Sequence, residues 1–195
     1  MPQRACICDY QVSVRAKARF WLLTHAKEFY KPTNTGRLIV DTIQHSEVFS
    51  WKRTEPDLQF VSQLNDPSFD PYIVFPEGES YQHRMVEFEE KPGREPVFII
   101  LDGTWRQARR MFRKSPYLAD LPVLPLKTDR LTRYALRKPA SEQHLCTVEV
   151  GIELLKQAGE TQAAEAVEGY FEAFNRRYAE ARGLRDEVLE RINRV

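Results

Sequence analysis

The chain reads VFIILDGTWRQARRMFRK from residue 97 to residue 114, and this stretch decides its fold. An apolar, partly β-branched run from Val97 to Leu101 gives way to an acid, a glycine and a hydroxyl, and then to a basic segment. The apolar run predicts a strand that is buried on both faces, and Gly103 allows the tight turn that ends it. Asp102 and Thr104 are therefore expected at the carboxyl end of a strand, where open α/β sheets usually bind ligands.

The segment after this turn is predicted to be an amphipathic helix with one basic face. Helical spacing places four arginines on one side and four apolar residues on the other. No acidic residue stands among them, so the guanidinium groups are free to bind an external anion such as phosphate. A plain solvated helix is the alternative interpretation. The basic residues are Arg106, Arg109, Arg110 and Arg113, followed by Lys114, and the apolar residues are Trp105, Ala108, Met111 and Phe112.

Composition is consistent with one globular domain that has a substantial core. The chain has 195 residues, of which 42% are hydrophobic, and its 29 basic and 28 acidic side chains nearly balance. The charge is nevertheless segregated, because residues 106–138 are strongly basic and contain only Asp120 and Asp129 as acids. This segregation predicts a surface for a polyanion such as RNA. We expect a single domain over residues 1–195, with an N-terminal segment at 1–18 and C-terminal helices at 160–195 packed on it.

Strand and helix patterns alternate along the chain and predict an α/β fold, a mostly parallel sheet with helices on both faces. Strands are expected at residues 19–24, 72–75 and 97–101, with an extended segment at 123–126. A helix should open near Thr35, with Asn34 or Thr35 as its N-cap. Four prolines predict turns between residues 51 and 79, namely Pro56, Pro67, Pro71 and Pro76.

The last part of the chain is predicted to be helical and to pack on the domain. Apolar residues recur on one helical face, which is typical of core packing. Gly183 is expected to separate this helix from a final one. The residues of the apolar face are Ala163, Val167, Tyr170, Phe174 and Tyr178.

Three blocks of sequence resemble the DTW-domain family. Asp102-Gly103-Thr104-Trp105 is similar to the Asp-x-Thr-Trp signature of that family, and residues 31–38, KPTNTGRL, are similar to a second family block. A weaker third match joins Leu136-Arg137 to residues 142–149, EQHLCTVE. The blocks occur in the family's order and extend from about residue 20 to about residue 155, which is more specific than one short motif.

This resemblance implies a fold, a reaction and a group donor. The family is SPOUT-like, so the implied fold is a Rossmann-type sheet with a C-terminal knot. The implied reaction transfers the 3-amino-3-carboxypropyl group of S-adenosylmethionine to N3 of a tRNA uridine, giving acp3U and methylthioadenosine. The sulfonium already makes a good leaving group, so no metal is required. An RNA methyltransferase on the same scaffold and a non-catalytic RNA-binding module remain open alternatives.

Asp102, Thr104 and Trp105 are the expected catalytic residues. N3 of uridine carries a proton and is a poor nucleophile until that proton is removed, so the reaction needs a carboxylate as base or orienting acceptor, and Asp102 fits this role. Thr104 would donate a hydrogen bond to the uracil or to the amino acid moiety of the donor. Trp105 either stacks on a flipped base or anchors its helix in the core.

The other candidate residues are expected to contact the group donor or the RNA. The second block offers amide donors at a helix start, although Thr35 could simply cap that helix, and Arg37 can bind an anion through a bidentate fork. By resemblance, the third block approaches the donor. Donor contacts are expected at Thr33, Asn34, Thr35, Gly36, Leu101, Gly103, Leu136, Cys146, Thr147 and Glu149. RNA contacts are expected at Arg37, Arg106, Arg109, Arg110, Arg113, Lys114, Arg133 and Arg137.

We expect neither a metal site nor a membrane association. Cys6 and Cys8 lack the earlier Cys-x-x-Cys pair of the family, and two thiolates cannot complete a four-ligand zinc site. The histidines at positions 25, 45, 83 and 144 show no ligand spacing and are expected to be surface or capped residues. No apolar run approaches the ~20 residues of a membrane span, and the first residues lack the core of a signal peptide. The expected protein is a cytoplasmic monomer with reduced cysteines that binds tRNA and needs no obligate protein partner.

Overall fold

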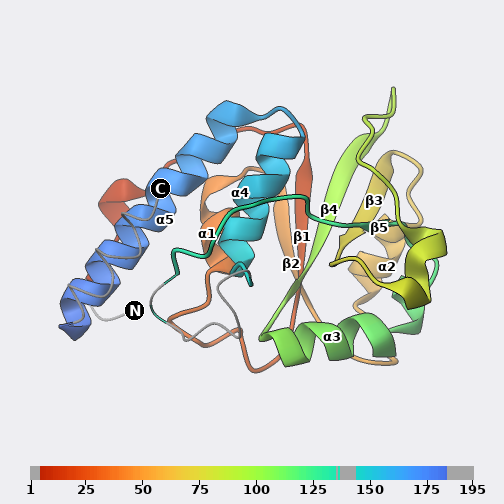
Figure 1. Cartoon of the computed structure of the whole chain (residues 1–195), viewed down its shortest axis with the longest axis horizontal. Coiled ribbons are helices and arrows are strands. Elements are labelled where there is room, and N and C mark those ends of the chain that lie inside the picture. Colours follow the sequence, from red (N-terminus) through yellow and green to blue (C-terminus); the bar gives the residue numbers. More distant parts are fainter. Residues whose placement is uncertain (1–4, 135, 137–143, 184–195) are drawn as a thin grey trace.

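The computed structural model describes residues 5–134, 136 and 144–183, and shows a five-stranded sheet with helices on both faces (Figure 1). All the strands pair in parallel, in the order β2-β1-β4-β3-β5. The predicted α/β class is therefore confirmed. The strands are β1 (Arg19–Thr24), β2 (Ser46–Ser50), β3 (Phe69–Val74), β4 (Glu95–Asp102) and β5 (Val123–Leu124).

The helices form two layers, one on each face of the sheet. Alternate residues of β1 supply both cores, because Phe20 and Leu22 pack on one face while Trp21 and Leu23 pack on the other. The first layer holds α1 (Gly36–Thr42), α4 (Thr147–Gln157) and α5 (Thr161–Arg182), and the second holds α2 (Leu58–Leu64) and α3 (Trp105–Lys114). Short 3₁₀ helices lie at Cys8–Tyr10, Glu79–Arg84 and Pro116–Leu118.

The decisive stretch folds as its sequence predicts. Residues 97–101 lie in β4, between β1 and β3, and each is at most 6% exposed. Asp102 is the last residue of β4, and Thr104 is the N-cap of α3. On α3, Ala108 and Met111 are buried, whereas the basic residues are exposed. The strand, the turn and the two faces of the helix are therefore confirmed.

The chain leaves the neighbouring strands β1 and β4 towards opposite faces of the sheet. After β1 it enters α1, which packs in the layer with α4 and α5, and after β4 it enters α3 on the other side. The two connections diverge at the carboxyl edge of the sheet, so a topological switch point lies between β1 and β4. In open α/β sheets such a switch point is the usual place for a ligand.

The region between residues 46 and 79 differs from its prediction. Pro71 lies inside β3, so the turn expected there was wrong. The N–H groups of Ile73 and Phe75 point towards β5, and Pro71 faces the same side but lies beyond the end of that short strand. Its missing N–H therefore costs no ladder hydrogen bond. Strand β2 and helix α2 were not predicted at all.

The C-terminal helix has the predicted core face. All five apolar residues named for it are buried in α5. Gly183 ends the helix in the left-handed region, with a φ of 71°, a conformation that glycine adopts without strain. The final helix predicted after it falls outside the described residues.

Candidate functional site

Asp102 lies at the switch point and holds three segments of the chain together. Its side chain is buried, and its Oδ2 accepts hydrogen bonds from Asn34 Nδ2 at 2.7 Å and from Thr24 Oγ1 at 3.2 Å. Its Oδ1 accepts from Thr147 Oγ1 at 2.8 Å. The donors come from the end of β1, the loop before α1 and the start of α4. An ionised carboxyl offers about four acceptor positions, and these donors occupy three of them.

Burial makes Asp102 a stronger base than an exposed aspartate. It raises the pKa of this carboxyl above its ordinary value, while the hydrogen bonds from Asn34 and Thr147 lower it and the nearby Glu28 adds to the rise. A general base works best when its pKa approaches the operating pH. A buried carboxyl whose pKa is raised is also typical of functional sites.

The loop of the second sequence block packs directly against Asp102. Asn34 Oδ1 accepts the N–H of Gly36 at 2.7 Å, and this bond orients the Asn34 amide so that its nitrogen faces the carboxylate. A Cβ on Gly36 would lie 3.0 Å from Asp102 Oδ1, so a side chain at this position would crowd the carboxylate. Thr35 occupies the N-cap position of α1 but makes no side-chain cap there. Its Oγ1 instead accepts from the N–H of Val148 at 3.4 Å, which joins the second block to the third.

Within the third block, Thr147 reaches Asp102 while Glu149 faces the interior. Glu149 is fully buried and accepts from Arg133 N at 2.6 Å, from Thr132 Oγ1 at 2.7 Å and from Cys146 N at 2.9 Å. These contacts fasten residues 132–133 to the start of α4. The structure thus gives Glu149 an anchoring role, and its predicted contact with the group donor stays a prediction.

The two other predicted catalytic residues open α3. The Thr104 hydroxyl accepts from Gln107 N at 3.4 Å and donates to Gln107 Oε1 at 2.9 Å, which forms a capping box. Trp105 is half-buried and stacks on Phe75 with ring centroids 5.6 Å apart, as the core-anchor alternative predicts. Its ring also lies 4.9 Å from that of His144. A contact of Thr104 or Trp105 with a substrate stays a prediction.

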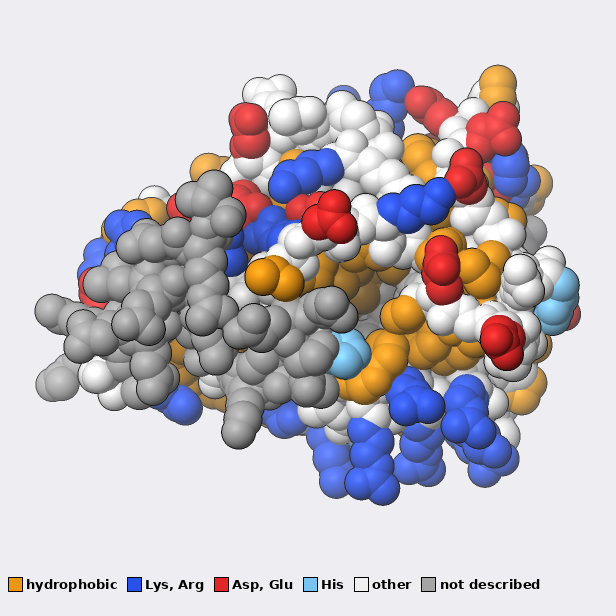
Figure 2. Space-filling model, in the orientation of Figure 1, with side chains coloured by type: hydrophobic (Ala, Val, Ile, Leu, Met, Phe, Trp, Pro, Cys, Tyr) orange, Lys and Arg blue, Asp and Glu red, His pale blue; other side chains and the backbone are white. Residues whose placement is uncertain are grey.

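The basic residues of α3 form an exposed cationic surface, the α3 basic face. Lys and Arg side chains gather along this edge of the molecule (Figure 2). They line a shallow pocket together with Trp105. Within the described part of the chain, none of them forms an ion pair with an acid. The α3 basic face comprises Arg106, Arg109, Arg110, Arg113 and Lys114.

The remaining predicted RNA contacts lie elsewhere. Arg133 pairs with Glu168 at 3.9 Å and Glu172 at 3.7 Å, which holds it against α5. Arg37 is half-buried on α1, where its charge opposes the rise that burial causes in the pKa of Asp41. Neither residue belongs to the α3 basic face, and their predicted contacts with RNA stay untested.

Other predicted contacts lie near Asp102, on the α1 and α4 side of the sheet, or outside the described residues. The carbonyl oxygen of Thr33 accepts from the Tyr134 hydroxyl at 2.6 Å, and Leu136 packs against the core on the side of α1 and α4. Leu101 and Gly103 flank Asp102 in the chain. Arg137 and Glu142 lie outside the described residues.

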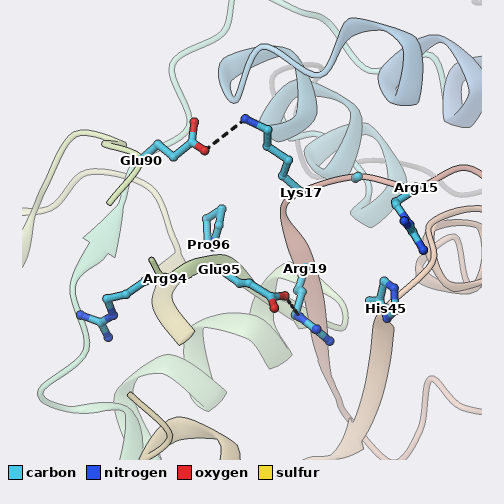
Figure 3. Close-up of a pocket in the computed structure, with 9 residues that line it drawn as sticks. Arg15, Lys17, Arg19, His45, Glu90, Arg94, Glu95 and Pro96 are labelled. Carbon is cyan, nitrogen blue, oxygen red and sulfur yellow. Dashed lines mark hydrogen bonds and ion pairs between the residues drawn. The ribbon is translucent and has the colours of Figure 1, made fainter. Parts of the chain in front are cut away.

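A second concavity lies at the opposite edge of the sheet (Figure 3). It contains basic residues, but Lys17 pairs with Glu90 at 3.2 Å and Arg19 pairs with Glu95. These acids offset much of its positive charge. Among the residues that the structure describes, no acid pairs with the α3 basic face, so the carboxyl edge of the sheet is the better candidate for binding a polyanion.

His25, which the sequence predicts to be a surface or capped residue, lies at the site. Its backbone N–H donates to the Asp102 carbonyl at 3.0 Å, and its ring stacks on Trp51 with centroids 5.4 Å apart. The ring also contacts the side chain of Gln107. The signal that could have found it is its position directly after β1, at the same sheet edge as Asp102.

The described residues contain no group of three or more histidine, cysteine, aspartate or glutamate side chains that could hold a metal ion. Cys6 and Cys8 are both free thiols, with sulfur atoms 2.6 Å apart. Among the same residues, no helix is long and apolar enough to cross a membrane.

Comparisons with known proteins agree with the resemblance seen in the sequence. A family model described as "DTW domain" matches residues 1–179. Two similar proteins, from Macaca fascicularis and Mus musculus, are both named "tRNA-uridine aminocarboxypropyltransferase 2" and are 25% and 24% identical over 158 residues. The matches cover 76% of this chain and 51% of each relative, so the chain spans about half the length of these relatives. No solved structure matches.

Proposed function

Because the chain belongs to the DTW-domain family, we propose that it transfers the 3-amino-3-carboxypropyl group of S-adenosylmethionine to N3 of a uridine in tRNA. The relatives' names support this reaction. The observation that carries the proposal is the buried Asp102 carboxylate at the switch point, four residues before the α3 basic face begins in the chain.

The proposal places S-adenosylmethionine at the switch point, where the loop before α1 and the start of α4 meet Asp102. The molecule supplies an electrophilic γ-carbon next to a sulfonium leaving group, together with an amino acid end that needs hydrogen-bond partners. Residues 33–36 and Thr147 offer backbone and hydroxyl groups around Asp102 for that end. Gly36 leaves no side chain between this loop and the carboxylate. The donor contacts predicted from the sequence at these positions are part of the proposal.

In the proposed transfer, the N3 proton of the uridine and the electron pairs of the bonds that form and break each have a defined destination. Asp102 accepts the N3 proton of the uridine, and the freed N3 electron pair forms a bond to the γ-carbon. The bond from the γ-carbon to sulfur breaks, and sulfur keeps that electron pair as the thioether of methylthioadenosine. Transfer to the γ-carbon rather than to the methyl carbon then depends on which carbon lies in line with N3 and sulfur.

The α3 basic face is proposed to hold the tRNA backbone. Phosphate contacts of this kind position an RNA without reading its sequence, and they lead its backbone past the turn that carries Asp102. A cytoplasmic monomer with a SPOUT-like knot completes the proposal.

The test is the release of methylthioadenosine from S-adenosylmethionine, measured by liquid chromatography with and without an unmodified tRNA transcript. The proposal expects release that requires the tRNA and the wild-type protein and is lost in Asp102→Asn. Formation of adenosylhomocysteine would replace the proposal with an RNA methyltransferase. Tight tRNA binding without either product would replace it with a binding module.

A further inference from the structure

The ring of His25 has one nitrogen that acts only as an acceptor. Nδ1 accepts the backbone N–H of Lys27 at 3.2 Å and lies 3.3 Å from Gln107 Nε2. A backbone N–H cannot accept a hydrogen bond, so Nδ1 must present its lone pair to Lys27 and carry no proton. The neutral ring therefore carries its proton on Nε2.

The side chain of Gln107 also requires an unprotonated Nδ1. Its Oε1 accepts both the backbone N–H of Thr104, at 2.7 Å, and the Thr104 hydroxyl, at 2.9 Å. These two bonds fix the amide, so the end that faces His25 is the NH₂ group, which only donates. Thr104, through Gln107, thus sets which nitrogen of His25 bears the proton, an arrangement in which a partner of one ring nitrogen defines the role of the other.

The Nε2–H of His25 is available for a ligand. Among the described residues, Nε2 has no hydrogen-bond partner, and it is not one of the buried polar atoms that lack a partner. The ring is held in place by its stack on Trp51, whose Nε1 donates to Ser115 Oγ at 2.8 Å. The stack and the contacts at Nδ1 hold the ring in one orientation, so the Nε2–H donor is preorganised for a ligand.

The surroundings of His25 disfavour its charged form. Burial lowers the pKa of the ring, and the charge of Glu28 opposes this lowering. Three cations lower the pKa further, namely Lys27, Arg110 of α3 and Lys31. The two donors on Nδ1 also oppose a second proton. The ring therefore stays a neutral donor at neutral pH.

The position of His25 identifies its ligand. Its backbone touches Asp102, and Arg110 of the α3 basic face lies over the same Trp51 ring, 5.9 Å from the ring centre. An RNA strand that is held by α3 and delivers a base to Asp102 passes this point. Every nucleotide carries acceptor oxygens on its phosphate, its ribose and, in most bases, its base edge.

We propose that His25 is a further substrate-binding residue, whose neutral Nε2–H donates to an acceptor oxygen of the RNA strand beside the target nucleotide, and that Gln107 is the positioning residue that keeps this donor in place. The inference rests on the proposed RNA substrate. It adds a hydrogen-bonding contact to the electrostatic contacts of α3.

The first test compares tRNA dissociation constants of His25 variants. His25→Phe keeps a ring against Trp51 but removes the donor, and it should weaken binding of an unmodified tRNA transcript about threefold to tenfold, the loss typical of one neutral hydrogen bond. His25→Gln returns an amide donor near the Nε2 position and should recover most of that loss. Wild-type affinity in His25→Phe would overturn the proposal. If His25→Phe still weakens binding after the neighbouring bases are changed, the acceptor is a phosphate or ribose oxygen. If the loss disappears when one particular base is changed, the acceptor is an oxygen of that base.

Gln107→Glu is the sharper variant because it preserves the fold. Glutamate at this position still completes the capping box with Thr104, but its carboxylate cannot donate to His25 Nδ1. The carboxylate of this glutamate favours a proton on Nδ1 of His25 and raises the pKa of the His25 ring. The tRNA affinity of this variant should therefore fall as the pH rises from about 6 to about 8, as Nε2 loses its proton, whereas the wild type shows no such change. A flat profile in both proteins would contradict the proposal.

Nitrogen-15 NMR of the histidine rings reads the protonation directly. The wild-type spectrum should show His25 as the neutral Nε2–H form at pH 7, and a proton on Nδ1 or a charged ring would overturn the inference. Neither this spectrum nor the binding assays require turnover. A failure of the proposed transfer, with no methylthioadenosine formed, is thus distinct from a failure of the role given to His25.

Discussion

Replacing Asp102 by asparagine separates the chemistry of this carboxylate from its structural role. In Asp102→Asn, the amide oxygen can take the place of Oδ2 and keep the hydrogen bonds from Asn34 and Thr24. The amide nitrogen then faces Thr147 Oγ1, and the hydroxyl can rotate to accept instead of donate. All the buried polar groups remain paired, so the free energy of unfolding should change by less than about 1 kcal/mol.

Asp102→Ala is the matched variant in which the hydrogen bonds are removed. Asn34 Nδ2 retains the carbonyl of Glu28 at 3.3 Å, and Thr24 Oγ1 retains that of Leu22 at 3.5 Å, so part of the loss is offset. The expected loss in unfolding free energy is about 1–3 kcal/mol, the cost of weakened buried polar groups. Urea unfolding of the two variants and the wild type measures both changes.

Both Asp102 variants should lose transfer, because neither an amide nor a methyl group can take the N3 proton. The single-turnover rate with saturating tRNA and S-adenosylmethionine should fall about 10²- to 10⁴-fold, the contribution usual for a general base. The tRNA dissociation constant should stay within about twofold of wild type, which serves as the control for folding. Transfer by Asp102→Asn at the wild-type rate would refute the assignment of the base.

The pH dependence of stability gives a second measurement of the same carboxyl. Burial raises the pKa of Asp102 in the folded state, so the folded protein holds this proton more tightly than the unfolded chain. Relative to Asp102→Asn, the wild type should therefore be most stable below about pH 4, the unfolded pKa, and lose stability as the pH rises through the folded pKa. The transfer rate should rise over the same range. A relative stability that increases with pH would contradict a raised pKa.

Two further predictions concern the α3 basic face and the interior. Arg109→Ala with Arg113→Ala should weaken tRNA binding and reduce the slope of log affinity against log salt by about 0.7 for each phosphate that the protein no longer neutralises. Arg15→Ala with Lys17→Ala, at the opposite sheet edge, is the charge-matched control and should change neither the affinity nor the slope. Equal effects of the two pairs would contradict a specific RNA-binding surface on α3. Glu149→Gln should lower the free energy of unfolding by about 2–3 kcal/mol in urea denaturation, because in either orientation the new amide NH₂ faces a fixed backbone N–H; a loss below about 0.5 kcal/mol would contradict the anchoring role.

The strand β4 and the helix α3 could be predicted because their signals are local. An apolar run, a glycine and a hydroxyl at the N-cap specify a buried strand, a turn and a helix start within a few residues. Strand β2 lacks such a signal, since it lies at the sheet edge and buries only Phe49 among mostly polar residues. Helix α2 did carry one, because the Asp57 side chain caps Gln59 and Phe60, but the adjacent Pro56 favoured a turn.

The contacts of the site depend on tertiary packing and so were only partly predictable. Asp102 and Thr104 lie at the carboxyl end of a strand as predicted, and Asn34 and Thr147 were named as site residues. Their hydrogen bonds to Asp102 span 68 and 45 residues of sequence and exist only because α1 and α4 pack side by side. The role of Gln107 required a structure, since a capping box shows in sequence but its contact with His25 does not.

The most direct test of the proposed function is to ask which carbon reaches the uridine. S-adenosylmethionine carrying carbon-13 in its aminocarboxypropyl chain and deuterium in its methyl group is incubated with the protein and an unmodified tRNA transcript, and the digested nucleosides are analysed by mass spectrometry. We predict a uridine that carries the carbon-13 label and no deuterium. A deuterated methyl group on a nucleoside, or unlabelled nucleosides throughout, would contradict the proposal.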